Sequence, residues 1–144
     1  NTKKLGDELQ KLDYKLCTDG SDNHLLLVNL RNKNITGSKV EYILEKVGIS
    51  VNKNTIIGDK SAFSPSGIRI GLCAMTTRGM RPYDCERLAL LIDRSIKVAI
   101  EVGNEYKKMN DFKKKIDEIV NGELQNIQQE VIRYSRQFPY LNRI

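Results

Sequence analysis

The sequence predicts an α/β domain with an α+β-like two-layer arrangement, in which a small sheet of few strands is covered by helices. Three observations support this class. Short apolar runs bounded by turn residues, such as residues 24–30, are typical of strands. Apolar residues that recur every three or four positions, as in residues 83–108, indicate amphipathic helices. The 144 residues contain no internal repeat and are enough for one core, so we expect one domain.

The first third of the chain predicts a helix followed by two strands. Three leucines, spaced by four and three residues, form one apolar stripe on a helix of about residues 2–12, although Gly6 weakens this pattern. Residues 14–18 and 24–30 follow as strands, because the intervening residues 19–23 form a turn sequence rich in Asp, Gly, Ser and Asn.

The middle of the chain predicts a helix, a long polar loop and a further strand. Ser38 and Glu41 have capping-box spacing at the start of the helix, and Gly48 is positioned to end it in a left-handed conformation. From residue 49 to residue 65 the periodicity disappears, which predicts a loop, and long ordered loops are often functional. Residues 67–71 then predict a strand.

The remainder of the chain predicts helices that close the domain. One apolar stripe covers about residues 83–108. A second stripe begins near Phe112 and includes Val120, is interrupted at Asn121-Gly122, and continues to Pro139. We expect these apolar faces to belong to the core rather than to a binding site.

Composition limits the possible functions without selecting one. The net charge of +6 permits binding of nucleic acid or other anions but does not demonstrate it, and the basic run at residues 113–115 is best explained by solvation. No apolar run approaches the roughly 18–20 residues of a membrane span, and the first ten residues lack a signal-peptide pattern. We expect a cytoplasmic protein, with an organellar form left open. Because the chain opens on Asn1 rather than methionine, we also expect a fragment.

The cysteines and the single histidine predict neither a disulfide framework nor a metal site. Cys17, Cys73 and Cys85 are an odd number at wide spacings, so we expect reduced thiols. His24 has no cysteine or histidine near it in sequence. The sequence also contains no recognisable nucleophile with its base and no glycine-rich phosphate-binding turn.

An arginine within a predicted strand is the strongest candidate for a site. In "SPSGIRIG", Arg69 alternates with two isoleucines and therefore points to the opposite face. Its guanidinium must reach solvent, pair with a carboxylate or bind an anionic ligand, because burying it unpaired is costly. The preceding loop, residues 51–67, combines amides and hydroxyls with the ring of Phe63. This mixture suits a planar ligand with several hydrogen-bonding edges, and a solvated loop is the alternative.

Three segments resemble the C-terminal portion of the serine hydroxymethyltransferase family. They are "TDGSDNHLLLVNLR" (residues 18–31), "GISVNKNTIIGDKSAFSPSGIRIG" (residues 48–71) and "AMTTRG" (residues 74–79), in the order and spacing of the family. The resemblance extends over nearly the whole chain. It implies that residues 1–144 are one domain, the C-terminal small domain of a pyridoxal-phosphate enzyme of the aspartate-aminotransferase type (fold type I). The large cofactor-binding domain is absent from the sequence.

The resemblance also implies an activity and roles for individual residues. The family interconverts serine and tetrahydrofolate with glycine and 5,10-methylenetetrahydrofolate in one-carbon metabolism. Its "SGIRIG" arginine binds the carboxylate of the amino-acid substrate, a role that falls to Arg69, and a guanidinium offers the two parallel donors this requires. The family's folate-contacting asparagine corresponds to Asn54, and its short folate-binding segment to Ser61, Ala62 and Phe63. Tetrahydrofolate is thus the implied co-substrate and pyridoxal phosphate the implied cofactor.

The sequence departs from the family pattern in two places. Leu72 and Cys73 stand where the family commonly has threonine and proline, which leaves the rigidity of the backbone beside Arg69 uncertain. Ala62 stands where bacterial members often have proline, a change that a backbone contact would survive.

The lysine that holds the cofactor is missing as well. In the family it lies in a threonine- and histidine-rich segment of the large domain, and Lys53 and Lys60 lack such surroundings. We therefore expect no catalytic residue in this fragment and no activity from it alone. Its implied partners are serine or glycine, tetrahydrofolate, the large domain and further subunits of a dimer or tetramer. The alternatives are a non-catalytic ligand-binding module of the same fold and, favoured only by charge, a basic nucleic-acid-binding domain.

Overall fold

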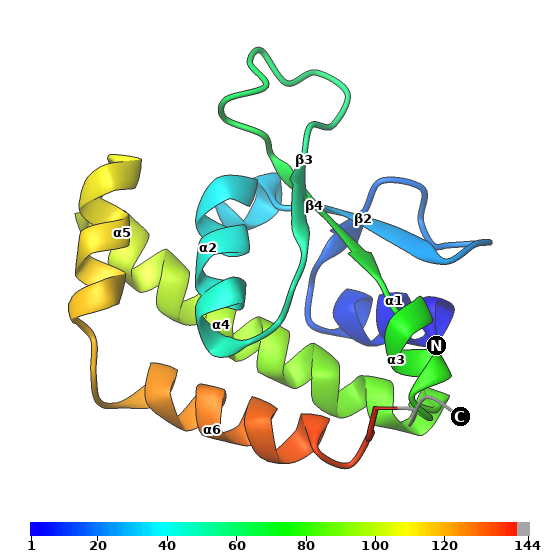
Figure 1. Cartoon of the computed structure of the whole chain (residues 1–144). Coiled ribbons are helices and arrows are strands. Elements are labelled where there is room, and N and C mark those ends of the chain that lie inside the picture. Colours follow the sequence, from blue (N-terminus) through cyan, green and yellow to red (C-terminus); the bar gives the residue numbers. More distant parts are fainter. Residues whose placement is uncertain (141–144) are drawn as a thin grey trace.

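A computed structural model describes residues 1–140 and contains a four-stranded antiparallel sheet with helices packed against one of its faces (Figure 1). In chain order the elements are α1 (Thr2–Lys11), β1 (Lys15–Leu16), β2 (Leu25–Asn29), η1 (Arg31–Lys33), α2 (Gly37–Val47), β3 (Asn52–Asn54), β4 (Gly67–Gly71), α3 (Cys73–Thr77), η2 (Pro82–Asp84), α4 (Cys85–Glu105), α5 (Met109–Glu118) and α6 (Glu123–Ser135). The predicted class, a small sheet covered by helices, is confirmed. The last four residues of the predicted domain, 141–144, lie outside the described part.

The sheet has the strand order β1-β2-β4-β3, and each neighbouring pair is antiparallel. Since alternate residues of a strand point to opposite faces, the buried residues gather on one side. The buried face is formed by Leu16, Leu26, Val28, Ile68 and Ile70. The alternation predicted around Arg69 is therefore confirmed, because both isoleucines are buried and the arginine is exposed.

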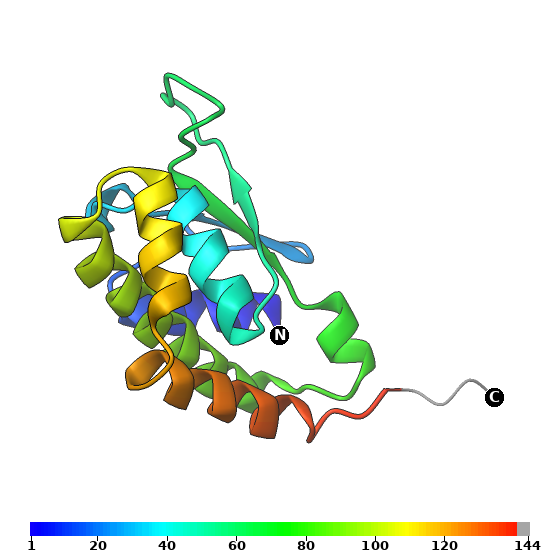
Figure 2. The same ribbon diagram turned by 60° about the vertical axis from the view of Figure 1, so that its left-hand side comes forward.

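Helices α1 and α2 pack directly against the sheet, and α4 runs beneath both of them and contacts α6 (Figures 1 and 2). One continuous core joins these layers, and its largest fully buried side chains include Leu5, Leu9, Ile43, Leu44, Ile92, Ile96 and Phe112. Gly6 has a packing reason. A Cβ atom at this position would lie 3.1 Å from methyl groups of both Leu16 and Leu26, so the glycine allows α1 to approach the strands closely.

Several short elements were not predicted, and two of them adjoin β4. Residues 52–54, expected as part of the loop, form β3 along the edge of β4, and residues 73–77 form α3 immediately after β4. Helix α3 fixes the backbone next to Arg69. Leu72 is buried, and its carbonyl accepts a hydrogen bond from the Thr76 N–H at 2.8 Å. The chain next to the arginine is thus anchored without the family's proline.

The expected capping box of α2 is wrong. The helix begins two residues earlier, with Thr36 as its N-cap, and the Thr36 hydroxyl accepts from the Lys39 N–H at 3.4 Å. The Glu41 carboxylate instead accepts from the Lys53 N–H at 2.7 Å, which ties α2 to β3. The predicted left-handed end is confirmed, because Gly48 has φ +92°.

One residue of the closing stripe was also assigned wrongly. Val120 is 69% exposed and is not a core residue, since it follows the end of α5 in the connection to α6. The predicted interruption itself is confirmed. Gly122, with φ +96°, lies between the two helices.

Candidate functional site

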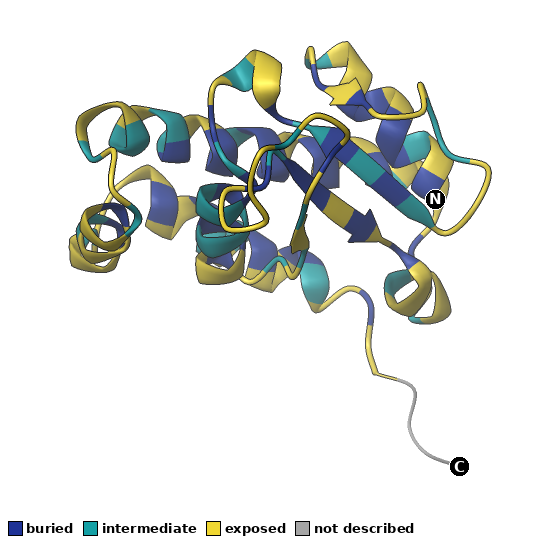
Figure 3. Ribbon diagram, turned by 90° about the horizontal axis from the view of Figure 1, so that it is seen from above, coloured by how far each residue is buried: buried dark blue, intermediate teal, exposed yellow. Residues whose placement is uncertain are grey.

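Arg69 lies on the sheet face opposite the helices. The burial pattern of β4 makes Arg69 an exposed residue. Figure 3 shows the sheet from above, with buried and exposed positions along its strands. Its cross-strand neighbours are Leu27 of β2 and Asn52 of β3, so neither side offers a negative charge. Within residues 1–140, Arg69 takes part in no ion pair. The guanidinium is therefore available to an anion from outside the described chain.

Asn54 shares this face with Arg69. It pairs with Gly67, two residues before Arg69, and cross-strand diagonal neighbours of this kind are about 7–8 Å apart. The Asn54 amide nitrogen donates to the Thr55 carbonyl at 2.7 Å, which fixes the side chain and leaves its oxygen as an acceptor. The structure thus brings together the predicted carboxylate-binding arginine and the predicted folate-contacting asparagine.

Ser61, Ala62 and Phe63 lie elsewhere, on the loop that projects beyond the ends of β3 and β4 (Figures 1 and 2). The Ser61 hydroxyl accepts from the Phe63 N–H at 3.1 Å, and this contact folds the segment into a tight turn. Phe63 is 94% exposed and borders a shallow hollow on the α2 side, next to Ser38 and Glu41. Phe63 therefore does not share the face that carries Arg69.

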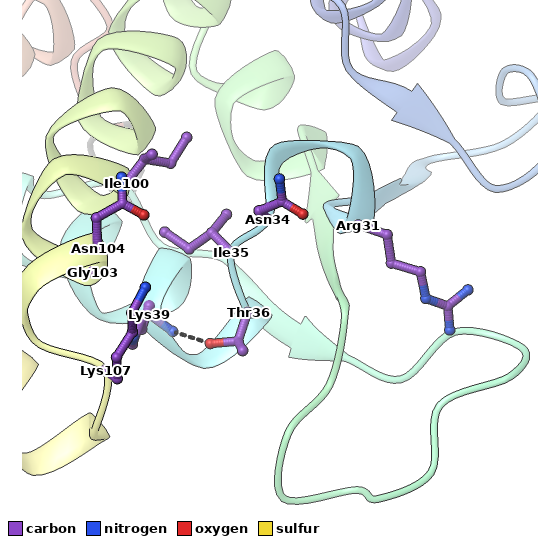
Figure 4. Close-up of a pocket in the computed structure, with 9 residues that line it drawn as sticks. All are labelled: Arg31, Asn34, Ile35, Thr36, Lys39, Ile100, Gly103, Asn104 and Lys107. Atoms are coloured by element: carbon purple, nitrogen blue, oxygen red, sulfur yellow. Dashed lines mark hydrogen bonds between the residues drawn. The ribbon is translucent and has the colours of Figure 1, made fainter.

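The base of this loop contains a polar cluster that the sequence analysis missed. The Asp59 carboxylate accepts hydrogen bonds from the Ser66 hydroxyl at 2.5 Å, from the Ile56 and Ser66 N–H groups at 2.9 Å each, and from Arg31 at 2.8 Å. Figure 4 shows Arg31 extending from η1 toward the loop. These donors, the Ser66 hydroxyl first, hold the pKa of the Asp59 carboxyl well below its usual range.

A second polar region is a cavity of about 270 Å³ between the start of α2 and the end of α4 (Figure 4). Burial, followed by the charge of Lys107, lowers the pKa of Lys39 there. Lys39 nevertheless has a structural role, because its ammonium donates to the Tyr106 carbonyl at the end of α4 at 3.2 Å. The residues lining this cavity therefore give weaker evidence for a binding site than the sheet face around Arg69.

Three further observations concern groups that often mark a site. Cys17 and Cys73 are exposed, Cys85 is buried, and all three are free. Within residues 1–140, no three His, Cys, Asp or Glu side chains lie close enough together to hold a metal ion. None of the helices in that part of the chain is both long enough and apolar enough to cross a membrane.

Comparisons with known proteins identify the family. The model of the serine hydroxymethyltransferase family matches residues 1–92. The chain is 43% identical over 143 residues to the cytosolic serine hydroxymethyltransferase of Candida glabrata and 46% identical over 122 residues to that of Saccharomyces cerevisiae. It is also 43% identical over 147 residues to the mitochondrial enzyme of Candida glabrata. These alignments cover 96%, 82% and 96% of this chain but 30%, 26% and 30% of the relatives, so the chain spans less than a third of their length. This chain belongs to the serine hydroxymethyltransferase family.

Proposed function

We propose that this chain is the C-terminal small domain of a serine hydroxymethyltransferase, also called glycine hydroxymethyltransferase. The whole enzyme interconverts serine and tetrahydrofolate with glycine and 5,10-methylenetetrahydrofolate in one-carbon metabolism. The observation that carries the proposal is Arg69, a guanidinium on an uncovered sheet face with no carboxylate paired to it in the described residues. The relatives named above include cytosolic and mitochondrial enzymes, which favours a cytoplasmic protein with an organellar form as the alternative.

In this proposal Arg69 binds the carboxylate of serine or glycine. The two isoleucines beside it are buried in the core, which fixes the strand from which the arginine projects. A planar guanidinium can donate two parallel hydrogen bonds to a carboxylate, and lysine cannot reproduce this geometry. The arginine therefore sets both the affinity for the amino acid and the direction in which the reacting carbon points.

Asn54 and the segment Ser61 to Phe63 contribute to the tetrahydrofolate site. The free amide oxygen of Asn54 can accept from a ring N–H of the pterin, and the exposed ring of Phe63 offers a surface for stacking. Because Asn54 ends β3 where the loop begins, a ligand that contacts all four residues has to extend from the sheet face along the loop.

Pyridoxal phosphate, the family's cofactor, would lie next to this chain without being attached to it. Covalent attachment needs a lysine, which in the family stands in a threonine- and histidine-rich segment. In this chain the single histidine, His24, is exposed, and the half-buried Lys39 already donates to Tyr106. We therefore assign attachment to the large domain, in a homo-oligomer of two or four subunits. When bound, the cofactor supplies the electron sink, whereas this chain supplies orientation and charge.

The test replaces Arg69 in the full-length enzyme. Arg69→Lys keeps the charge but removes the forked donor, and losing one partner of a desolvated charge pair costs about 2–5 kcal/mol. At about 1.4 kcal/mol per tenfold, serine affinity should fall by roughly tens to thousands of fold, with unchanged pyridoxal-phosphate content. Arg133→Lys, on the exposed side of α6, is the matched control. Near-normal serine affinity in Arg69→Lys would contradict the proposed function.

A further inference from the structure

We propose that Asp59 is a positioning residue for the folate co-substrate, which holds the loop of residues 55–66 in the shape that presents Ser61 to Phe63. This inference rests on the proposed function, because the ligand of the segment is the tetrahydrofolate assigned above. Asp59 does not itself touch the ligand. It acts through the loop that it closes.

A single carboxylate joins the two stems of the loop. Ile56 lies on the outgoing stem and Ser66 on the returning stem, and both N–H groups donate to the same Asp59 oxygen at 2.9 Å. The other oxygen accepts from the Ser66 hydroxyl and from Arg31. The Asp59 side chain is only 6% exposed, so its hydrogen bonds to Ile56 and Ser66 are sheltered from water, whereas the Arg31 side chain is 43% exposed.

The returning stem is anchored to the body of the domain independently of Asp59. The Ser66 carbonyl accepts from the Leu30 N–H at 2.9 Å, and the Pro65 carbonyl accepts from the Gly37 N–H at 2.8 Å. The outgoing stem continues from β3 and buries Ile56, and Asp59 couples it to the anchored stem. Arg31 adds a second tie from η1, because it donates to the Ile57 carbonyl through two N–H groups at 3.1 Å each.

Apolar packing does not hold the part of the loop beyond these ties. Ile57 is 99% exposed and Phe63 is 94% exposed, so these two side chains bury almost no surface within the described residues. A loop without packing would populate many conformations. A ligand that binds only one of them loses affinity, because the loop gives up conformational entropy on binding. The Asp59 carboxylate therefore helps to order the segment of Ile57 to Phe63, in which these two exposed side chains do not pack into the core.

The perturbation is Asp59→Asn, which keeps the shape of the side chain. A neutral amide has one accepting oxygen and directs an NH₂ group at donors, so at least two of the four hydrogen bonds are lost. We expect the KM for tetrahydrofolate to rise about tenfold to a hundredfold, by analogy with the loss of hydrogen bonds to a charged group. Serine affinity measured without folate should stay unchanged, because strand pairing on both sides holds Arg69.

The experiment uses the full-length holoenzyme and combines kinetics with limited trypsin digestion, since the loop contains a cleavage site after Lys60. Asp59→Asn should raise the folate KM and also accelerate cleavage at Lys60 in the ligand-free enzyme. Ser66→Ala, which removes only the hydroxyl donor, should have a smaller effect of the same kind and serves if Asp59→Asn fails to fold. Asp22→Asn, an exposed carboxylate in another turn, is the control and should change neither quantity.

The outcomes separate this inference from the proposed function when Asn54→Ala is measured in parallel. If Asn54→Ala raises the folate KM while Asp59→Asn and Ser66→Ala leave it unchanged, the folate site stands and the positioning role is refuted. If Asn54→Ala also has no effect, the folate assignment fails and the inference fails with it. Faster cleavage together with weaker folate binding and normal serine binding supports the inference, because a general loss of structure would weaken both substrates.

Discussion

The buried Tyr14 tests how much one hydrogen bond between the segment after α1 and helix α4 stabilises the domain. The Tyr14 hydroxyl donates to Asp93 on α4 at 2.9 Å, and the two residues are only 3% and 4% exposed. Burial, followed by this hydrogen bond, raises the pKa of Tyr14, so the hydroxyl stays protonated and remains the donor. Tyr14→Phe removes the hydroxyl alone and leaves a buried carboxylate with Lys97 as its remaining partner at 2.7 Å.

The expected loss of unfolding free energy is about 2 kcal/mol, since hydrogen bonds to charged groups contribute about 1.5–3 kcal/mol and an unsatisfied buried acceptor is costly. Tyr42→Phe is a matched control, because Tyr42 also donates to a carboxylate, that of Asp117, at 2.8 Å. Asp117 is 50% exposed, so water replaces the lost donor and the cost should stay below about 0.5 kcal/mol. Urea unfolding followed by circular dichroism measures both. Equal losses in the two variants would refute the argument that burial sets the difference.

Three further predictions concern local features. Thr36→Ala should destabilise the domain by about 1 kcal/mol and Ser38→Ala by much less in the same urea assay, since Thr36 is the N-cap of α2. Gly6→Ala should destabilise it by about 1 kcal/mol, because the strain against two buried leucines exceeds the gain in helix propensity. The folded-state pKa of Asp59 lies below its unfolded value, so its contribution is present above about pH 4 and is lost as the pH falls further. Hydrogen exchange of the Ser66 amide should lose protection only in that acidic range.

The helices could be predicted because their signals are local. An apolar stripe, a terminal glycine and an interrupting Asn-Gly pair lie within one short segment each, so α4 was expected over residues 83–108 and is observed over Cys85–Glu105. The start of α2 was missed because Thr36 and Ser38 are both capable N-caps. The Gly37 N–H donates to the Pro65 carbonyl at 2.8 Å, and this contact with a distant segment is not visible in the local sequence.

The strand β3 and the Asp59 cluster could not be read from the sequence for a different reason. Asn52 to Asn54 contains no apolar residue, and it becomes a strand because its backbone pairs with β4. The partners Arg31 and Asp59 are 28 residues apart, and no periodicity connects them. Sequence patterns therefore identified the residues of the candidate site. Which charged side chains pair with each other inside the domain depends on the three-dimensional structure.

The pairing of Asp59 with Arg31 bears directly on the proposed function. Asp59 is the acidic residue nearest to Arg69 in the sequence, and a pairing between the two would have left no positive charge for a substrate. The loop instead directs Asp59 back toward Arg31, where four donors satisfy its carboxylate. Arg69 is thereby left between Leu27 and Asn52, neither of which can neutralise it. The Asp59 carboxylate is thus satisfied by the loop and by Arg31, and Arg69 has no acidic partner within residues 1–140.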